Sequence, residues 1–442
     1  MEYVPVGLIA LGVAIVVIVV VLWRPAPGGS ERPAEQDGPL PEPAPGAPVL
    51  RVVALGLEGA GKTVLLASQF HTLSETAHDR RYFLDAEWEQ ENYLARMYAS
   101  VSDTSAPWPK ATRIGNLEDI LFSCMAHDRM GAERTLFQIS YLDYAGELLE
   151  SESFDQPDDQ SQARSGERGA VNELKAKVQN AHALLLILDG RRMLQLLRNE
   201  HEGHDYFDRR LAPLLAVARR AECPVQLILT KWDLVRTFSD TGDGELLRQV
   251  QGRLMSYGRV RLLVQAHVHR HEEVRLIPVS AVGPRFAVPD AEGKMIKRAD
   301  GKLEPFHVDV PLCAVLPDVL RHLERALDAS IRHGIEQEIG RHKLRDGPAI
   351  AHSVLMSPAG RTLQKALGGI VGDQIVKLFV DLLVRSNLPD AAPPAAYRDE
   401  QRGSRGADEE QIQQLRTEVL GDMRRIVERL EARLPSSILS IR

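Results

Sequence analysis

Cysteine is scarce in this sequence of 442 residues. Its three cysteines, Cys124, Cys223 and Cys313, lie far apart, and no CxxC pair occurs. A disulfide framework uses a dense, even set of cysteines, and a structural zinc site uses closely spaced ones. The sequence therefore argues against a disulfide-stapled fold and against a cysteine zinc site, and it favours a reducing compartment.

An excess of basic residues is also missing. The formal net charge is −7 at pH 7, with 54 Lys and Arg against 61 Asp and Glu. Proteins that bind nucleic acid usually present a basic field to its phosphates. We therefore expect no nucleic-acid partner. The chain exceeds one average domain in length, so it can bury a large core and still carry additional regions.

Charged residues are absent from one stretch near the N-terminus. Residues 4–23 are 20 uncharged residues, and a helix of that length is about 30 Å long, which matches the core of a bilayer. A cleaved signal peptide is the alternative, but the first three residues are acidic rather than basic, and Arg24 and Pro25 follow in place of a small-residue cleavage site. We expect residues 1–24 to be a single-pass transmembrane anchor. Because the nearest cation is Arg24, the remainder is expected on the cytoplasmic side of a bacterial inner membrane.

The next segments predict a linker and then an α/β domain. Residues 25–48 contain eight prolines and predict an extended linker. Alternating strands and helices imply a mostly parallel sheet with helices on both faces, here over residues 49–335 with insertions, and its ligands should bind at the carboxyl ends of the strands. A hairpin is expected between residues 284 and 312. The predicted strands are residues 50–55, 135–142, 183–188, 225–229 and 274–279, and predicted helices include residues 170–180 and 209–221.

Residues 336–442 predict a separate helical region. Within residues 408–434, apolar residues recur at spacings of three and four, close to a heptad pattern. Such a helix can pack on its own domain, or it can self-associate as a coiled coil. The apolar positions are Ile412, Leu415, Val419, Met423, Ile426, Leu430 and Leu434.

A glycine-rich loop follows the first predicted strand. Residues 56–63 read GLEGAGKT and match the P-loop pattern G-x-x-x-x-G-K-T, placed between a strand and a helix. Its backbone N–H groups and the helix N-terminus bind phosphates. Lys62 is expected to reach the β- and γ-phosphates, and the Thr63 hydroxyl to ligate Mg²⁺. The other residues expected to contact nucleotide here are Gly56, Glu58, Gly59, Ala60 and Gly61.

Asp143 follows a second apolar run and is the expected Walker B carboxylate for Mg²⁺. Gly146 lacks a Cβ, so its N–H can approach the γ-phosphate. Acidic residues follow Gly146 without a basic residue among them up to Asp159. This acidic run is either a solvated surface or a switch surface for a basic partner.

Two later segments predict recognition of guanine. Residues 230–233 read TKWD. The Asp233 carboxylate can accept hydrogen bonds from both N1–H and the 2-amino group of guanine, which adenine does not offer. The stem of Lys231 can lie along the base, and Thr230 completes the motif. Ser280 and Ala281 follow a further strand, where a backbone N–H would meet guanine O6.

With these four segments in order, the chain resembles the Ras-like small GTPase superfamily over about residues 49–335. The predicted anchor makes it similar to membrane-bound members such as the signal-recognition-particle receptor beta subunit. The resemblance implies GTP and GDP as ligands with Mg²⁺, slow hydrolysis of GTP, and recruitment of a protein effector or regulator that the sequence does not name.

Three positions depart from the family pattern. Glu58 stands where many small GTPases have glycine, and it brings a carboxylate towards the phosphates. Glu147 stands where the family has a glutamine that positions water, so its charge opposes the γ-phosphate. The switch I threonine, a second Mg²⁺ ligand, is predicted to be Thr112, with Thr104 as second choice. We therefore expect Lys62, Glu147 and Thr112 to act in catalysis, and keep a non-hydrolysing GTP-binding scaffold and a P-loop ATPase as alternatives.

Two polar features have simpler interpretations. Asp189 follows a buried strand and is expected to cap the next helix. His267, His269 and His271 alternate, which predicts exposed positions on one face of a strand.

Overall fold

The computed structural model describes residues 47–77, 80–109, 118–143, 165–270, 272–290, 294–341, 347–387 and 404–440. The predicted anchor and residues 25–46 of the predicted linker lie outside these ranges, as do Thr112, Gly146 and Glu147. None of the helices in the described ranges combines the length and apolar character that a membrane span needs. The described residues form one compact unit.

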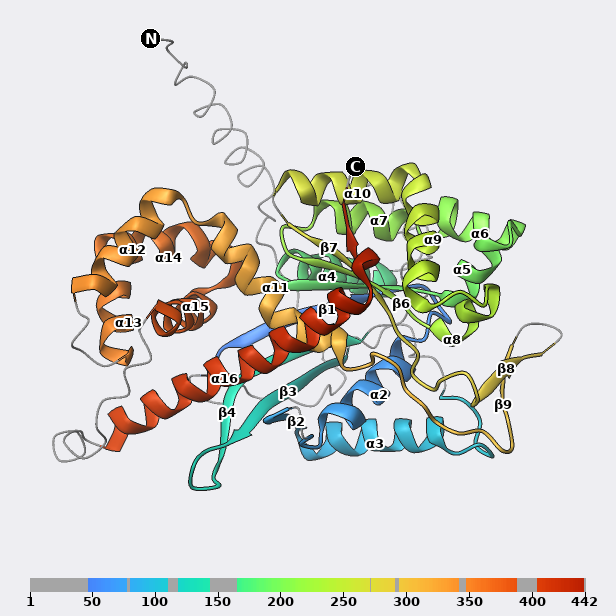
Figure 1. Cartoon of the computed structure of the whole chain (residues 1–442), viewed down its shortest axis with the longest axis horizontal. Coiled ribbons are helices and arrows are strands. Elements are labelled where there is room, and N and C mark those ends of the chain that lie inside the picture. Colours follow the sequence, from blue (N-terminus) through green and yellow to red (C-terminus); the bar gives the residue numbers. More distant parts are fainter. Residues whose placement is uncertain are drawn as a thin grey trace, which may run out of the picture. The chain divides into compact units, whose positions relative to one another are not determined.

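An eight-stranded sheet lies at the centre of this unit (Figure 1), in the order β10-β7-β6-β5-β1-β4-β3-β2. The neighbours β4-β1-β5-β6-β7 are parallel, and β2, β3 and β10 are added antiparallel. The strands are β1 Val49–Leu55, β2 Tyr82–Ala86, β3 Glu118–His127, β4 Glu133–Asp143, β5 Ala183–Leu188, β6 Val225–Leu229, β7 Val274–Pro278 and β10 Ile438–Leu439.

β5 is continuously apolar, and β6 and β7 are apolar apart from Gln226 and Arg275. Every residue of β5, β6 and β7 is buried, so both faces of the sheet are covered there. The predicted α/β fold with a mostly parallel sheet is confirmed, and each of the five predicted strands is present within a residue or two of its expected ends. Their parallel order brings the carboxyl ends of β1, β5, β6 and β7 to one edge.

Three strands of this sheet, β2, β3 and β10, were not predicted. β2 and β3 lie in the long insertion between the P-loop and Asp143, and β3 forms a hairpin with β4 that has a bulge between Cys124 and Met125. Polar and apolar residues do not alternate regularly in β3, which reads EDILFSCMAH. The insertion therefore extends the sheet by antiparallel pairing, a feature that the apolar-run criterion misses.

The helices between residues 62 and 269 connect the strands and cover the sheet. Predicted helix 209–221 begins later than expected, because residues 206–210 form a π-helical turn. The helices are α2 Lys62–Leu73, α3 Trp88–Ser102, α4 Ser165–Gln179, α5 Gly190–Leu197, α6 His201–Asp205, α7 Ala212–Arg220, α8 Trp232–Val235, α9 Asp243–Ser256 and α10 Gly258–His269.

The three alternating histidines lie on a helix and not on a strand. His267 and His269 end α10, and His271 lies outside the described residues. His267 is fully buried, where its ring contacts the Glu272 carboxylate and the carbonyl of Ala218, 2.9 Å from Nε2. The predicted strand was wrong, because alternation over five residues is too short to outweigh the helical pattern of residues 258–269. Of the two described histidines, His269 is exposed as predicted and His267 is not.

Helices beyond residue 310 belong to the same compact unit as the sheet. α16 lies along α11 (Figure 1) and also contacts β4, while β10 pairs with β7. Contacts therefore cross residue 335, where the sequence predicted a boundary between two regions. These helices are α11 Val310–Ala326, α12 Ala329–Arg341, α13 Gly347–Met356, α14 Pro358–Val371, α15 Asp373–Asn387 and α16 Ser404–Arg433.

The near-heptad seam of α16 faces the protein's own core. Val419, Met423, Ile426, Leu430 and Leu434 are each at most 5% exposed and belong to the main hydrophobic cluster. Self-association through residues 408–434 would have to expose these side chains. The structure therefore favours the alternative in which this helix packs on its own domain.

His182, just before β5, accepts a hydrogen bond from β1, and it should make the free energy of unfolding depend on pH. The Arg51 N–H donates to its Nδ1 at 3.0 Å, and burial, with the Arg51 guanidinium, lowers the pKa of His182 from 6.5 to about 3. Because the folded state holds the neutral ring, its contribution is complete above pH 6.5 and is lost as the pH falls towards 3. Between pH 6.5 and 5 we expect a loss of about 2 kcal/mol in the free energy of unfolding.

Urea unfolding of the native protein and of His182→Asn at several pH values measures this loss. Asparagine can still accept the Arg51 N–H but does not titrate, so the variant should show a flatter dependence between pH 5 and 6.5. Equal slopes for the two proteins would contradict the assignment.

Candidate functional site

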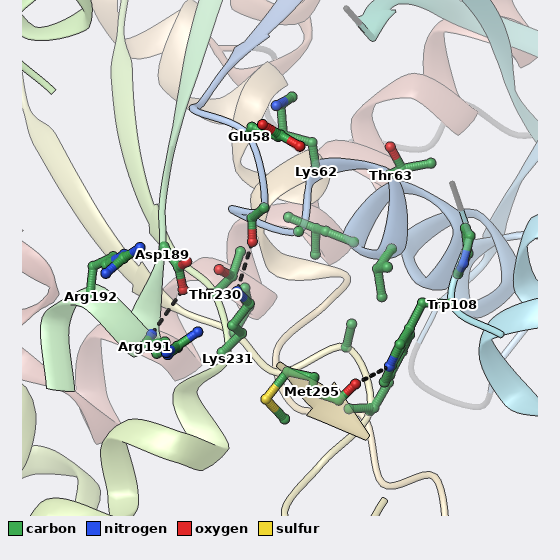
Figure 2. A pocket seen from close by; sticks show the side chains of 18 of the residues that line it. Glu58, Lys62, Thr63, Trp108, Asp189, Arg191, Arg192, Thr230, Lys231 and Met295 are labelled. Carbon is green, nitrogen blue, oxygen red and sulfur yellow. Dashed lines mark hydrogen bonds and ion pairs between the residues drawn. The ribbon is translucent and has the colours of Figure 1, made fainter. Parts of the chain in front are cut away.

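A pocket of about 440 Å³ lies at the carboxyl ends of β1, β5, β6 and β7. Figure 2 shows Asp189, Arg191 and Arg192 on one side of it and Trp108 on the opposite side, with Lys231 between them. The structure places nine of the predicted site residues in its lining. They are Glu58, Gly59, Gly61, Lys62, Thr63, Thr230, Lys231, Asp233 and Ala281.

The P-loop is shaped by its glycines. Gly59 and Gly61 have φ angles of 74° and 89°, in the left-handed region that side chains disfavour. Gly56 packs so closely on β5 that a Cβ there would lie 2.8 Å from Ile187 Cβ. Gly61 then caps α2, whose first residue is Lys62. The loop therefore presents a helix N-terminus to the pocket, an arrangement that binds anions.

The ammonium group of Lys62 lies inside the loop. Its Nζ donates to the carbonyl of Gly56 at 2.7 Å and to that of Leu57 at 3.3 Å. The side chain is buried, so a phosphate that entered the loop would meet a desolvated cation. Thr63 is half-buried and lines the same pocket, while Glu58 is exposed at its rim.

The loop after β6 is hydrogen-bonded to the P-loop. Thr230 donates through Oγ1 to the carbonyls of Ala60 at 2.7 Å and Leu188 at 3.0 Å. Lys231 adopts a left-handed backbone, with φ of 51°, and its Nζ donates to the carbonyl of Gly59 at 2.7 Å. This geometry places the Lys231 stem along one wall of the pocket, as the sequence predicted for a base-contacting lysine.

Asp233 is a buried carboxylate in the lining of the pocket. It is 5% exposed, and Ser280 Oγ donates to its Oδ1 at 2.6 Å. Burial raises the pKa of Asp233, and the Ser280 bond opposes that rise. Ser280 also accepts the N–H of Gly283 at 2.9 Å, so two predicted segments, 230–233 and 280–281, meet in one hydrogen-bonded unit. Ser280 itself supports Asp233 and does not line the pocket.

Trp108 and a hairpin form a wall that the sequence did not predict as part of the site. The predicted hairpin is present as β8 Ala287–Pro289 and β9 Met295–Lys297. Trp108 Nε1 donates to the carbonyl of Met295 at 2.8 Å, and Lys297 Nζ lies 4.8 Å from the centre of the indole. Both Trp108 and Met295 line the pocket (Figure 2).

The remaining predicted residues are placed only in part. β4 runs beside β1 with Leu142 opposite Val53, so Asp143, which ends β4, comes to the P-loop edge of the sheet. The other predicted groups, Thr112, Gly146 and Glu147, lie outside the described residues. Thr104, the second choice for switch I, is absent from the pocket lining.

A protein-family comparison identifies the chain. Residues 51–278, just over half of the sequence, match the model of the family described as Double-GTPase 2. The chain belongs to the Double-GTPase 2 family. This Double-GTPase 2 protein is thus a member of the P-loop GTPase superfamily, as its ordered segments predicted. A search of curated proteins gave no match.

Three solved structures with a bound guanine nucleotide are similar to this chain, each at 14% identity. The match to a structure of Sup35 with GDP covers 56% of this chain and 40% of the Sup35 chain, with a TM-score of 0.27. The match to Era from Aquifex aeolicus with GDP and AlF4− covers 62% of this chain and 66% of the Era chain, with a TM-score of 0.25. The match to the signal recognition particle receptor complex SRb-GTP/SRX from Chaetomium thermophilum covers 53% of this chain and 91% of the matched chain, with a TM-score of 0.22. The chain thus spans under half of the Sup35 chain.

Membership of this GTPase family makes GTP and GDP, with Mg²⁺, the expected ligands of the pocket. The residues fit this assignment, because a phosphate-binding loop with a desolvated lysine lies at one end and a buried carboxylate at the other. No cluster of three or more His, Cys, Asp or Glu side chains fit to hold a metal occurs in the described ranges. The residues that the sequence predicts to hold Mg²⁺ are Thr63, which lines the pocket, and Asp143, at which β4 ends.

Proposed function

We propose that this protein is a membrane-anchored GTP-binding switch that hydrolyses GTP slowly and recruits a partner in the GTP state. The observation that supports guanine recognition most directly is the Asp233–Ser280 pair in the same pocket as the P-loop lysine. The proposed anchor rests on residues 4–23 and would place the GTPase in the bacterial cytoplasm. Extraction of the full chain from membranes with alkaline carbonate would contradict the anchor.

Each end of the pocket has a separate task. Lys62 and the N–H groups of the P-loop hold the β- and γ-phosphates, and Thr63 and Asp143 hold Mg²⁺, which supplies charge neutralisation on the phosphates. Asp233 accepts from guanine, and Lys231 flanks the base. Because Thr230 joins the β6 loop to Ala60 of the P-loop, base recognition and phosphate binding are coupled through one short contact.

Calorimetric titration of the detergent-solubilised full chain with GDP, GTP, ADP and ATP in Mg²⁺ tests this function. We expect guanine nucleotides to bind at least 100-fold more tightly than adenine nucleotides, because adenine leaves the Asp233 carboxylate without its two donors. Preference for ATP would overturn the assignment and support a P-loop ATPase. Nucleotide-dependent capture of a partner, compared between GTP-analogue and GDP states, tests the switch.

A second candidate is a GTP-binding scaffold without useful turnover. Glu58 is the structural observation that favours it, since this exposed carboxylate lies on the P-loop at the rim of the pocket. Its charge would oppose the negative charge on the phosphates. Single-turnover release of phosphate from bound GTP separates the two candidates.

Glu58→Gly is expected to raise the single-turnover rate about tenfold, because a nearby like charge is removed from the reacting phosphates. Phosphate release at saturating GTP measures this. Glu75→Gly, which changes another exposed glutamate away from the pocket, serves as the control. An unchanged rate in Glu58→Gly would contradict a repulsive role for this carboxylate.

A further inference from the structure

We propose that Asp189 positions Lys231, so that guanine affinity depends on an ion pair between the ends of two neighbouring strands. Lys231 Nζ lies 2.9 Å from Asp189 Oδ1, with side-chain exposures of 24% and 10%. Asp189 follows β5 and Lys231 follows β6, and these strands are parallel neighbours. The inference rests on the proposed guanine recognition and assigns a positioning residue to it.

The Asp189 carboxylate is itself held in place. Its Oδ1 accepts the N–H of Arg191 at 2.9 Å, so it caps α5 as predicted. The N–H of Asp189 donates to the Tyr206 hydroxyl at 3.3 Å. One carboxylate oxygen therefore meets both a helix N-terminus and the lysine, and its position is determined by the backbone rather than by Lys231.

Gly190 allows the two loops to come this close. A Cβ on Gly190 would lie 2.0 Å from the carbonyl oxygen of Thr230 and 2.9 Å from that of Lys231. Only glycine fits at this contact without moving one of the backbones. The absence of a side chain at residue 190 thus places the carboxylate of residue 189 beside the lysine of residue 231.

The lysine needs this support because its stem is long and flexible. Its Nζ donates to the Gly59 carbonyl at 2.7 Å and pairs with the Asp189 carboxylate. Arg191, Arg192 and Arg210 also line the pocket. Without the negative charge of Asp189, these cations would repel the ammonium group from the Gly59 carbonyl and so displace the lysine stem that is proposed to flank the base.

Asp189→Asn separates the ion pair from the helix cap, since asparagine caps helices as well as aspartate. We expect the Kd for GDP, measured by calorimetry on the full chain, to rise about tenfold, while the urea midpoint stays unchanged. The matched control is Asp128→Asn. Asp128 also accepts backbone N–H groups, of Met130 and Ala132, and pairs with Arg134, but it lies in the β3–β4 turn away from the pocket.

A double-mutant cycle tests whether Asp189 acts through Lys231. In a Lys231→Met background, Asp189→Asn should change the GDP Kd less than twofold, because the interaction that it disrupts is already gone. An equal change in both backgrounds, or no change in the native background, overturns the proposal. If native protein binds no GDP, the proposed function fails instead, so the two failures are distinguishable.

Discussion

Asp233→Asn is expected to weaken GDP binding by roughly 100-fold and to create binding of xanthosine diphosphate. The native carboxylate accepts from the N1–H and 2-amino donors of guanine, and burial leaves water no access to replace them. Xanthine carries a carbonyl in place of the 2-amino group, which an asparagine amide can meet with a donor. Calorimetry with both diphosphates measures the exchange of preference.

Ser280→Ala provides a graded comparison for this result. The Ser280 hydroxyl only orients the carboxylate, through its 2.6 Å bond to Asp233. Its removal should cost about tenfold in GDP affinity without any gain for the xanthine nucleotide. Failure of Asp233→Asn to gain xanthosine diphosphate would contradict the placement of the base at this end of the pocket.

Arg275→Met is expected to lower the free energy of unfolding by about 3–5 kcal/mol, because it removes one partner of a buried ion network. Arg275 lies on β7, is 1% exposed, and contacts Asp318 of α11 at 2.9 Å as well as Glu431 of α16. Burial opposes its charge, yet these carboxylates raise the pKa of the guanidinium above its usual value. Urea unfolding of the variant measures the loss.

Arg298→Met is the matched control for Arg275. Arg298 pairs with Asp300 at 3.4 Å, but the two side chains are 46% and 80% exposed. Replacing it should change the free energy of unfolding by less than about 0.5 kcal/mol. A loss below about 1 kcal/mol in Arg275→Met would show that Asp318 and Glu431 are solvated or protonated once the arginine is gone.

The sequence predicted the central sheet and the P-loop well, for a physical reason. β5 and β6 are buried on both faces, and their apolar sequence, broken only by Gln226 in β6, predicts both ends of each strand correctly. Loops at the carboxyl ends of parallel strands lie at the same edge of the sheet, so the sequence could assign Lys62, Lys231 and Asp233 to one site. In contrast, β2 and β10 pair antiparallel at the outer edges of the sheet and are short.

Contacts between side chains of distant segments could not be predicted from the sequence. The capping role of Asp189 was predictable from its place before a helix, but its pairing with Lys231 depends on how closely the β5 and β6 loops approach. The Trp108 wall depends on an insertion after Ser280 folding back onto the end of α3, where Lys297 Nζ donates to the carbonyl of Asp103 at 2.9 Å. No periodicity links these residues.

The position of Trp108 has a practical consequence for spectroscopy. Among the tryptophans of the described residues, Trp88 is 75% exposed and Trp232 is fully buried, whereas Trp108 is half-buried at the pocket. Its indole therefore provides an intrinsic fluorophore next to the expected purine. Emission from Trp108 should respond to nucleotide directly, and Trp108→Phe should remove that response, so the occupancy of the pocket can be followed without a label.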